Sequence, residues 1–571
     1  MTKFDRRRVL GGISAMLCLS AAPSALLAQQ PQNPNPVPPP QTPPQPRFGF
    51  EDVQRRAREV AAVAYEPPAA LPEPLARLDY DSWRDIRFRP DRALLAQNGS
   101  PFRMQMFHPG FLFTRPVTVN VVRDGVPTPV PYSANLFDYG KVKFDKPLPV
   151  NLGFAGFRLH YPLNDPRVLD ELIAFIGASY FRVLGREQRY GLSARGLAIG
   201  AGTNSEEFPV FREFWVEQPA ANAERIIVNA LLDSPSLTGA YRFTIYPDVD
   251  TLVEVAATLI PRKPIERLGL APLTSMFFTG ENDRRFFEDY RPELHDSDGL
   301  MIHSGSGEWL WRPLRNPKQQ AVSAFVERSP RGFGLMQRDR NFEHYQDLDL
   351  AYERRPSYWV EPQGDWGEGV IELIEMPTAD ESNDNVVVQW TPKTPLEPGK
   401  EFAFGYRLTA MLDSSDLHPG GRVVNTFQAA PKALGSVEPV ADGARRFIVD
   451  FAGGDLDYHL KQPDKVEIVP SITRGKIDRA FLVPNPKING FRAFVDITGE
   501  PGQLAEMRAF LKSGPKTLTE TWSYPWRAEA SEKPAPQQPA QPSPQAQSDQ
   551  PPPAQPQPAP PSAPAQQKPG Q

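Results

Sequence analysis

The sequence predicts a mainly β protein with two folded domains, and its strand patterns and length support this. Runs of β-branched and aromatic residues, such as PVTVNVVRDG, RIIVNALLDS, YRFTIYP and TLVEVAATL, are bounded by Asp, Gly, Pro or Ser. They follow one another too closely for helical crossovers, which favours antiparallel sheets. A second series, from RRFIVDFAG to TLTETWSYPW, has the spacing of a small immunoglobulin-type sandwich. The 571 residues also exceed what one core usually serves.

The chain begins with the features of an export signal. The arginines from Arg6 to Arg8 precede a short apolar run that ends near Ala28, an order typical of twin-arginine export; an ordinary secretory signal is the alternative. Residues 1–28 are therefore predicted to be a signal peptide, and the exported chain is expected in the periplasm. Residues 29–47 are rich in Pro and Gln, cannot bury apolar surface, and are predicted to be a disordered tether.

The first folded domain is predicted over residues 48–411. It begins with an amphipathic helix over residues 48–65, because apolar residues recur there at helical spacing. A second helix is predicted at DPRVLDELIAFIGASYF, residues 165–181, where Asp165 can cap the helix and Pro166 can occupy its first turn. The strand series resumes with VVVQWTP and EFAFGYRLTAML.

A linker and a second domain follow. Residues 412–425 contain several Ser, Pro and Gly and are typical of a linker. Residues 426–527 contain the second strand series and form the predicted immunoglobulin-like domain. Residues 528–571 consist mainly of Pro, Gln and Ala, and are predicted to be a disordered tail.

Composition excludes several classes of function. The net charge of -5 gives no electrostatic reason to bind nucleic acid or an anionic membrane. The only cysteine, Cys18, lies in the predicted signal, so the exported chain is expected to have no thiol nucleophile and no disulfide. His295 and His303 do not match a metal-ligand spacing, and neither a GxSxG motif nor a phosphate-binding glycine loop occurs. No metal and no cofactor is predicted, which leaves carboxylate chemistry.

Carboxylates, aromatic residues and glycines are concentrated between Pro272 and Asn385. Aromatic side chains beside isolated carboxylates suit a protein that binds or cuts a sugar chain. GSGEWLW, at residues 305–311, is interpreted as a hairpin turn. Four tryptophans interrupted by Gly and Pro are typical of loops that line a groove, although core positions are the alternative: Trp309, Trp311, Trp359 and Trp366.

Spacing alone does not choose a catalytic pair among the acidic residues. Asp296 and Asp298 lie in HDSDG, which also suits a turn cap or a partial calcium loop. Asp384 lies in NDN before a strand, where an Asx-turn is the default. Asp347 and Asp349 are more typical of solvated or salt-bridged positions. Two carboxylates on different loops can hydrolyse a glycosidic bond, because one donates a proton to the leaving oxygen and the other activates water.

Nine blocks carry a specific resemblance that runs from about Phe48 to Tyr524: GFAGFRLHYPLN, GASYFRVLG, YGLSARGLAI, EEFPVFREFW, APLTSMFFTG, YRPELHDSDGL, GEWLWRPL, GFGLMQRDR and TLTETWSY. Together they resemble the periplasmic glucan biosynthesis proteins G and D, which serve osmoregulated periplasmic glucan production. The resemblance implies a large galactose-mutarotase-like β-sandwich followed by a smaller immunoglobulin-like domain. It also implies inverting, endo-acting hydrolysis of β-1,2-glucan. The signal looks more like the D type, but the sequence does not decide between G and D.

The resemblance assigns roles to individual residues. Asp296 falls on the general base and Asp384 on the general acid. Tyr352 and Glu381 fall on a hydrogen-bonded path around the site, in which the proton travels through a substrate hydroxyl and water, whereas Asp298 is not carried over. Because the acid must hold a proton near neutral pH, we expect Asp384 to be partly buried among apolar groups and Asp296 to be in a more polar place.

Substrate contacts and partners complete these expectations. Tyr180 and Arg195 lie in two of the blocks and are expected to bind the substrate together with the four tryptophans. The expected partners are β-1,2-glucan and the membrane glucan glucosyltransferase, and a homodimer stays open. The alternative function is a non-catalytic glucan-binding or branching-accessory protein. A third is an interaction protein whose immunoglobulin-like domain docks on the glucosyltransferase.

Overall fold

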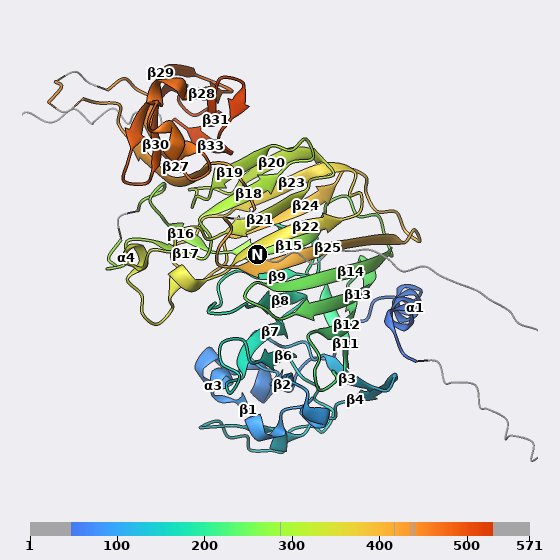
Figure 1. Cartoon of the computed structure of the whole chain (residues 1–571). Helices are drawn as coiled ribbons and strands as arrows, with labels where there is room; N and C mark the ends of the chain where they lie inside the picture. The colour runs from blue at the N-terminus through green and yellow to red at the C-terminus, as the bar shows by residue number, and fades with distance from the viewer. Residues whose placement is uncertain (1–46, 286, 416, 434, 438–439, 529–571) are drawn as a thin grey trace, which may run out of the picture. The chain divides into compact units, whose positions relative to one another are not determined.

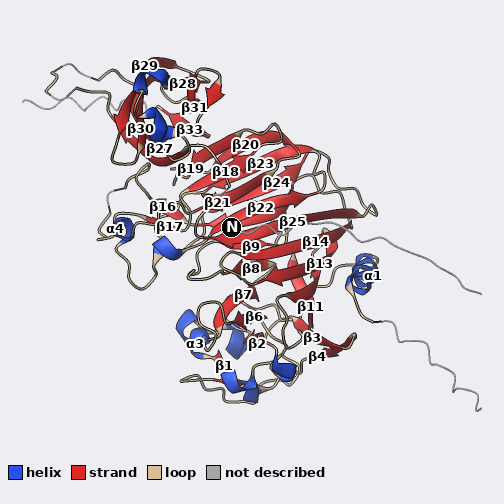
Figure 2. Ribbon diagram, viewed as in Figure 1, coloured by secondary structure: helices blue, strands red, loops and turns tan. Residues whose placement is uncertain are grey.

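The computed structural model describes residues 47–285, 287–415, 417–433, 435–437 and 440–528. The predicted signal peptide, the tether before Arg47 and the tail after Ala528 lie outside the described residues. Strands dominate the described chain and helices are few and short (Figure 2), so the predicted mainly β class is confirmed. None of the helices in these ranges combines the length and the apolar character needed to cross a bilayer.

Within the described residues, ten strands form one antiparallel sheet. In order across the sheet they are β2 (Arg103–Phe107), β6 (Gly156–Tyr161), β7 (Asp170–Ile176), β8 (Tyr180–Val183), β9 (Ser193–Arg195), β15 (Leu268–Ser275), β24 (Val386–Pro392), β23 (Glu368–Glu375) and β20 (Ala321–Arg328), and β10 (Ala198–Ile199) pairs with β15. Strands far apart in the sequence, such as β9, β15 and β24, therefore lie side by side (Figure 1).

A second sheet contains fifteen strands of the described chain. In order they are β28 (Glu467–Ile472), β31 (Leu504–Ser513), β33 (Thr521–Arg527), β19 (Trp309–Pro313), β18 (Gly299–His303), β21 (Gly332–Met336), β22 (Ser357–Gln363), β25 (Phe402–Met411), β14 (Thr251–Pro261), β13 (Leu237–Tyr246), β12 (Ile226–Asp233), β11 (Val210–Glu217), β3 (Thr118–Arg123) and β4 (Val126–Pro129), with β32 (Lys516–Thr517) beside β31. The pairs β3 with β11 and β19 with β33 are parallel, and the others are antiparallel.

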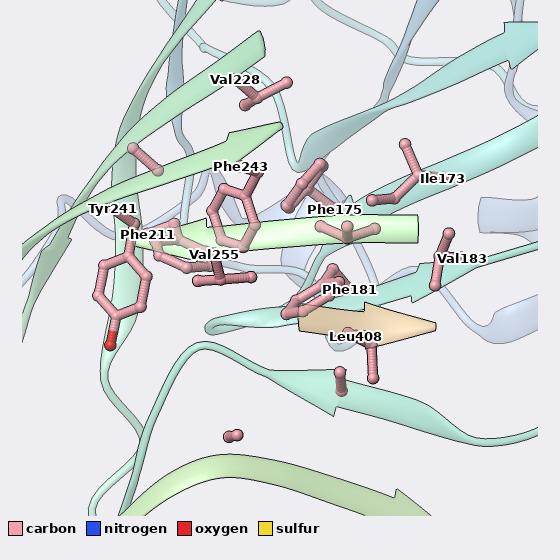
Figure 3. Close-up of a cluster of buried hydrophobic side chains, with 14 of the residues drawn as sticks. Ile173, Phe175, Phe181, Val183, Phe211, Val228, Tyr241, Phe243, Val255 and Leu408 are labelled. Carbon is pink, nitrogen blue, oxygen red and sulfur yellow. The ribbon is translucent and has the colours of Figure 1, made fainter. Parts of the chain in front are cut away.

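The two sheets pack face to face around an aromatic core. Phe175 and Phe181 of the first sheet lie 5.1 and 5.3 Å, between ring centroids, from Phe243 of the second (Figure 3). On the outside, helix α1 (Phe50–Ala61) buries Val53 and Ala57 against the second sheet. The predicted N-terminal helix is confirmed, and the two sheets form the predicted large sandwich.

A smaller sandwich follows. Its first layer is the antiparallel sheet of β26 (Arg422–Ala429), β27 (Ala444–Ala452), β30 (Gly490–Thr498) and β29 (Lys476–Asn485). The other layer is the end of the fifteen-stranded sheet, so that Phe447 packs on Trp522 and Tyr524, with centroids 5.8 and 5.4 Å apart. Strand β26 begins inside the segment expected to be a linker, and β33 continues the sheet of the large sandwich through β19.

The predicted helix over residues 165–181 is wrong. Strands β7 and β8 occupy most of this range and pair with each other. The run from Leu172 to Phe175 is buried on both faces of its strand, and such a continuous apolar run cannot be told from a buried helix by periodicity. Gly177 and Ala178 both have positive φ and reverse the chain between the strands. Asp165 caps a turn instead, by accepting a hydrogen bond from the N–H of Arg167 at 2.8 Å.

The remaining elements of the described chain are short. Two further sheets consist of two strands each, β1 (Arg87–Phe88) with β5 (Phe137–Asp138) and β16 (Phe277–Thr279) with β17 (Leu294–His295). The short helices are α2 (Glu73–Ala76), α3 (Tyr80–Asp85), α4 (Phe342–Tyr345), α5 (Leu456–His459), η1 (Pro90–Arg92), η2 (Gln97–Gly99), η3 (Ala134–Leu136), η4 (Tyr352–Arg354) and η5 (Pro463–Lys465). Strands β18 and β19 form the hairpin predicted around residues 305–311.

Candidate functional site

The end of β15 brings the two predicted catalytic aspartates to one part of the large sandwich. Two successive backbone carbonyls accept hydrogen bonds there. The carbonyl of Ser275 accepts from the N–H of Asn385 at 3.1 Å, and that of Met276 accepts from the N–H of Asp296 at 2.8 Å. Asp384 directly precedes Asn385, so residues that are far apart in the chain meet at the same strand end.

The side chain of Asn385 fixes this arrangement. Its Oδ1 accepts a hydrogen bond from the N–H of Phe277 at 2.8 Å, and its Nδ2 donates to the carbonyls of Phe277 and Met376 at 3.0 and 2.9 Å. The Oγ of Ser275 donates to the Oγ of Ser297 at 2.9 Å. Within Asn383-Asp384-Asn385, the side chain that binds the backbone is therefore that of Asn385. The Asp384 side chain is exposed.

Asp296 is buried and ion-paired. The residue is 5% exposed, and its Oδ1 accepts a hydrogen bond from Nη1 of Arg355. The guanidinium carbon of Arg355 lies 3.7 Å from the ring centroid of Tyr352. A cation over an aromatic face and beside a carboxylate is attracted by both, so Asp296, Arg355 and Tyr352 form one packed group.

Tyr352 continues this group into the loop that carries Asp384. Its O–H donates to Glu381 at 2.5 Å, and Arg291 donates to both Glu381 oxygens at 3.0 Å. Arg291 also bonds Asp347 at 3.0 Å, so the salt-bridged interpretation of Asp347 is confirmed. Burial raises the pKa of Tyr352 and its bond to Glu381 adds to the shift, so the phenol stays protonated and donates. We call the set Asp296, Tyr352, Arg355, Glu381 and Asp384 the carboxylate site.

Asp384 is exposed, as are its neighbours Ser382 and Asn383. The expected burial of Asp384 is therefore wrong, whereas Asp296 is buried but has the polar surroundings expected of it, because it is ion-paired with Arg355. The reason is that Asp384 lies on a loop beyond the strand end, whereas Asp296 lies between two strands. The charge of Asp384 contributes to raising the pKa of both Tyr180 and Arg355.

Tyr180 and Arg195 are brought together on neighbouring strands. They face each other across β8 and β9, with the Arg195 guanidinium carbon 4.7 Å from the Tyr180 ring centroid. Arg195 also donates to Glu206 at 2.8 Å and is 7% exposed, so the half-buried Tyr180 offers more surface to a ligand. Burial raises the pKa of Tyr180, Arg195 opposes this shift, and Asp384 adds to it. Arg182, two residues along β8, is exposed on the same face.

The four tryptophans do not line one groove. Trp311 and Trp359 are 4% and 2% exposed and belong to the core beneath the small sandwich. The half-buried Trp309 stacks on Trp359, with centroids 5.8 Å apart. Trp366 lies elsewhere, against the core of the large sandwich, where its Nε1 donates to the carbonyl of Gly405 at 3.2 Å. The core alternative therefore describes these side chains better than the groove.

Three of these tryptophans belong to the contact between the two sandwiches. Trp311 pairs with Trp522 where β19 meets β33. The guanidinium carbon of Arg338 lies 3.6 Å from the Trp311 ring centroid, and its nitrogens donate to both oxygens of Glu520 at 2.6 and 3.0 Å. Glycine backbones fit under the rings, since a Cβ on Gly299 would meet the Trp311 ring at 2.2 Å. We call the set Trp309, Trp311, Arg338, Trp359 and Glu520 the tryptophan junction.

The HDSDG segment connects the site to the junction. The Oδ2 of Asp298 accepts hydrogen bonds from the N–H groups of Arg338 and Asp339 at 2.8 and 2.9 Å. Asp298 therefore binds the backbone of a distant segment, whereas the sequence predicted a cap within its own turn. The Asp296 carboxylate accepts a hydrogen bond from Arg355, and the Asp298 carboxylate binds the backbone of Arg338 and Asp339. The two carboxylates therefore have different partners and do not form the partial calcium loop that the HDSDG sequence also suited. Among the described residues, one group of potential metal ligands lies within 4.8 Å: Glu293, Asp339 and His344. His344 Nδ1 bonds Asp339 Oδ2 at 2.5 Å, so two of these ligands bind each other and we assign no ion.

Sequence reasoning missed the arginines of the site. Arg355 and Arg291 make its central ion pairs; Arg291 stands in the block YRPELHDSDGL but was given no role, and Arg355 stands in none of the nine blocks. Arg354 and Arg355 are adjacent, but Arg354 Nε donates to the backbone carbonyl of Glu187. No sequence signal separates the two, because their different roles follow from which way each side chain points.

Comparisons with known proteins show a family relationship over the whole described fold. A family model described as "Periplasmic glucan biosynthesis protein, MdoG" matches residues 48–526. Glucans biosynthesis protein G of Ralstonia nicotianae is 47% identical over 487 residues, covering 84% of this chain and 95% of the relative. Probable glucans biosynthesis protein D of Shewanella oneidensis is 43% identical over 484 residues, covering 84% and 88%.

Two further matches add little to this. Glucans biosynthesis protein G of Pseudomonas paraeruginosa is 43% identical over 486 residues, covering 84% of this chain and 92% of the relative. A solved structure, the Slr1438 protein of Synechocystis sp. PCC 6803, covers 54% of this chain and 100% of its own at 9% identity with a TM-score of 0.26, which is too low to support a structural argument. Relatives named G and D match at similar identity, so identity does not separate the two types.

Proposed function

Because the chain belongs to the MdoG family of periplasmic glucan biosynthesis proteins, we propose that it acts in the periplasm as an inverting endo-β-1,2-glucanase on the glucan backbone. The names of its relatives support a role in glucan biosynthesis. The observation that supports the hydrolytic proposal is that the segments carrying Asp296 and Asp384 converge at the end of β15, where Asp296 and Asn385, the residue after Asp384, bind successive carbonyls. Two carboxylates on different elements are the minimum that glycoside hydrolysis needs.

In the proposed reaction a water molecule attacks the anomeric carbon while the glycosidic C–O bond breaks. The Asp384 carboxyl donates its proton to the leaving oxygen and becomes ionised. The Asp296 carboxylate receives the proton of the attacking water through a substrate hydroxyl. Because water attacks the face opposite the leaving group, the anomeric configuration inverts. Exchange of both protons with solvent returns the two carboxyl groups to their starting states.

The two environments suit these roles once glucan is bound. A guanidinium hydrogen-bonded to a carboxylate favours its ionised form, as the base requires, and Arg355 supplies that contact to Asp296. Asp384 is open to solvent in the free protein. A sugar chain lying across a carboxyl removes water from it, and loss of water favours the neutral form that can donate a proton.

The test is incubation of residues 29–571 with linear β-1,2-glucan, followed by product sizing and anomer analysis. We expect short β-1,2-linked oligosaccharides whose new reducing ends have the inverted configuration. Asp384→Asn should abolish their release. Asp349→Asn is the matched control, since it removes an exposed carboxylate from the same stretch of chain outside the carboxylate site, and should leave the yield unchanged. Equal product from wild type and Asp384→Asn contradicts the assignment.

A second candidate is a non-catalytic glucan-binding or branching-accessory protein. The exposure of Asp384 favours it, because the free protein does not surround this carboxyl with the apolar groups that usually keep a general acid protonated. Binding measured by calorimetry together with the product assay separates the two functions. Glucan binding with no turnover by pure wild-type protein selects the accessory role.

A further inference from the structure

We propose that Arg355 is the positioning residue of the carboxylate site, which holds Asp296 in place and connects it to the loop that carries Asp384. This inference rests on the proposed hydrolysis and adds a residue that the sequence did not suggest. A positioning residue acts through another group and does not touch the reacting atoms itself. Arg355 meets this description, since its side chain is 10% exposed and lies between protein groups.

The contacts of Arg355 join the two halves of the site. Its Nη1 donates to the Oδ1 of Asp296, and its guanidinium plane covers the ring of Tyr352. The hydroxyl of that ring bonds Glu381 at 2.5 Å, three positions before Asp384 on the same loop. One side chain therefore contacts the proposed base directly and the loop of the proposed acid through a single ring.

The fold holds Arg355 in this position from two sides. Arg340 donates to the carbonyl oxygen of Arg355 at 2.5 Å and to that of Glu353 at 2.9 Å, which fixes the backbone. Gly191 leaves room for the side-chain stem, because a Cβ at that position would lie 2.9 Å from the Cβ and 3.0 Å from the Cδ of Arg355. The absence of a side chain at Gly191 is therefore a condition for the observed arginine conformation.

The charges around Arg355 favour a permanent cation. Asp296 binds it, and Glu381 and Asp384 attract it, while Arg182 and Arg291 repel it. Burial lowers the pKa of Arg355 to about 10, which still leaves the guanidinium charged at neutral pH. A lysine in its place keeps the charge but lacks the plane that stacks on Tyr352.

The test compares kinetics and stability of Arg355→Met, Arg355→Lys and Gly191→Ala with wild type. For Arg355→Met we expect kcat to fall about 100-fold, because misplacement of a reacting group by about 1 Å costs this much, with KM little changed. The acid limb of the kcat against pH profile should move to higher pH by about one unit or more, since the carboxylate has lost its cation. Arg355→Lys should restore the limb but only part of the rate. Gly191→Ala should lower kcat and move the acid limb to higher pH, in the same direction as Arg355→Met.

The matched control is Arg354→Met, which removes the adjacent arginine outside the site and should leave the pH profile unchanged. A folded Arg355→Met protein with the wild-type rate and pH profile overturns the proposal. So does a slower variant with an unmoved acid limb, because that result indicates a purely structural role.

A double-mutant cycle keeps the inference separate from the proposed function. Asp296→Asn, Arg355→Met and their combination are compared by Tm. Coupling between the two positions is expected whether or not the protein turns over glucan, because it measures the ion pair itself. Wild-type protein that releases no product contradicts the hydrolytic function, whereas additive changes in Tm contradict the hold of Arg355 on Asp296.

Discussion

The carboxylate site and the tryptophan junction are built from the same local chemistry. In each, an arginine lies over an aromatic ring and bonds a carboxylate: Arg355 is 3.7 Å from the Tyr352 ring and Arg338 is 3.6 Å from the Trp311 ring. In the junction the carboxylate side chain of Glu520 is 0% exposed. In the site the network runs outward to Glu381, which lies on the same loop as the exposed Asp384.

The two regions differ in whether a ligand can reach a carboxylate, and this difference distinguishes a structural ion pair from a reactive one. A fully enclosed pair can only stabilise or destabilise the fold, because no ligand reaches it. A pair that leads to an exposed carboxyl can transfer the effect of its charge to a ligand. The two regions are also connected. Asp298, two positions after Asp296 in the chain, accepts a hydrogen bond from the backbone N–H of Arg338. Variants in the two regions should therefore separate activity from stability.

The largest effect is expected for Asp296→Asn. It removes the proposed base, so the rate should fall about 10²–10⁴-fold. Because Asp296 is buried against Arg355, the variant should also lose about 1–3 kcal/mol of unfolding free energy. Rates and urea unfolding measure the two effects. Asp384→Asn is the comparison, since it should lose activity while changing stability by less than about 0.5 kcal/mol; equal destabilisation by both variants would remove the distinction between them.

The next effect is expected for Glu520→Ala in the junction. The variant leaves Arg338 buried without its bidentate partner, and breaking such a pair costs about 3–5 kcal/mol. Urea unfolding measures it. Glu401→Ala is the matched control, because its pair with Arg58 is about half exposed and should contribute about 0–1 kcal/mol. Similar losses in both variants would show that enclosure by the small sandwich does not strengthen the junction.

A smaller effect is expected for Trp311→Phe. The shorter ring uncovers Gly299 and leaves a cavity under Arg338, which should cost roughly 1–3 kcal/mol of unfolding free energy. Glucan binding should stay at the wild-type level, because the side chain is buried away from the site. A large loss of glucan affinity with unchanged stability would contradict the core assignment of Trp311 and support the sugar-binding groove that the sequence predicted.

The smallest effect is expected from the histidine beside the site. Burial alone lowers the pKa of His295, but its bond to Glu293 at 3.1 Å and the neighbouring carboxylates raise it overall to about 9 from the usual 6.5. Its contribution to stability is therefore complete below pH 6.5 and is lost as pH rises through about 9. Thermal unfolding should show Tm falling by a few degrees over this window.

His108 provides the opposite case. Burial lowers the pKa of His108 to about 4, although its hydrogen bond to the Pro109 carbonyl opposes this shift. The ring is therefore neutral in the folded protein and gains a proton on unfolding below pH 6.5. The free energy of unfolding should fall as pH drops from 6.5 to about 4. His295→Gln should flatten the dependence of Tm on the alkaline side, and His108→Gln on the acid side. An alkaline slope that His295→Gln leaves intact would assign it to another group.

The strands were predictable because their signal is local. The runs that form β3, β12, β13 and β14 alternate or bury β-branched residues between turn residues, and each strand overlaps the segment that the sequence indicated, although β13 begins four residues earlier and β14 ends two residues later. Helix α1 was predictable for the same reason, since its apolar residues repeat at helical spacing. The segment over residues 165–181 failed because a strand buried on both faces has no period.

The sequence by itself determined the mainly β class, the two strand series and, through the family resemblance, which two aspartates to compare. Only the tertiary structure decided which aromatic residues are core, which aspartate is buried, and that Arg355 rather than Arg354 serves the site. The physical reason is that burial and ion pairing depend on neighbours from distant strands. The end of β15 creates those neighbours by binding the loops of Asp296 and Asn385 at two successive carbonyls.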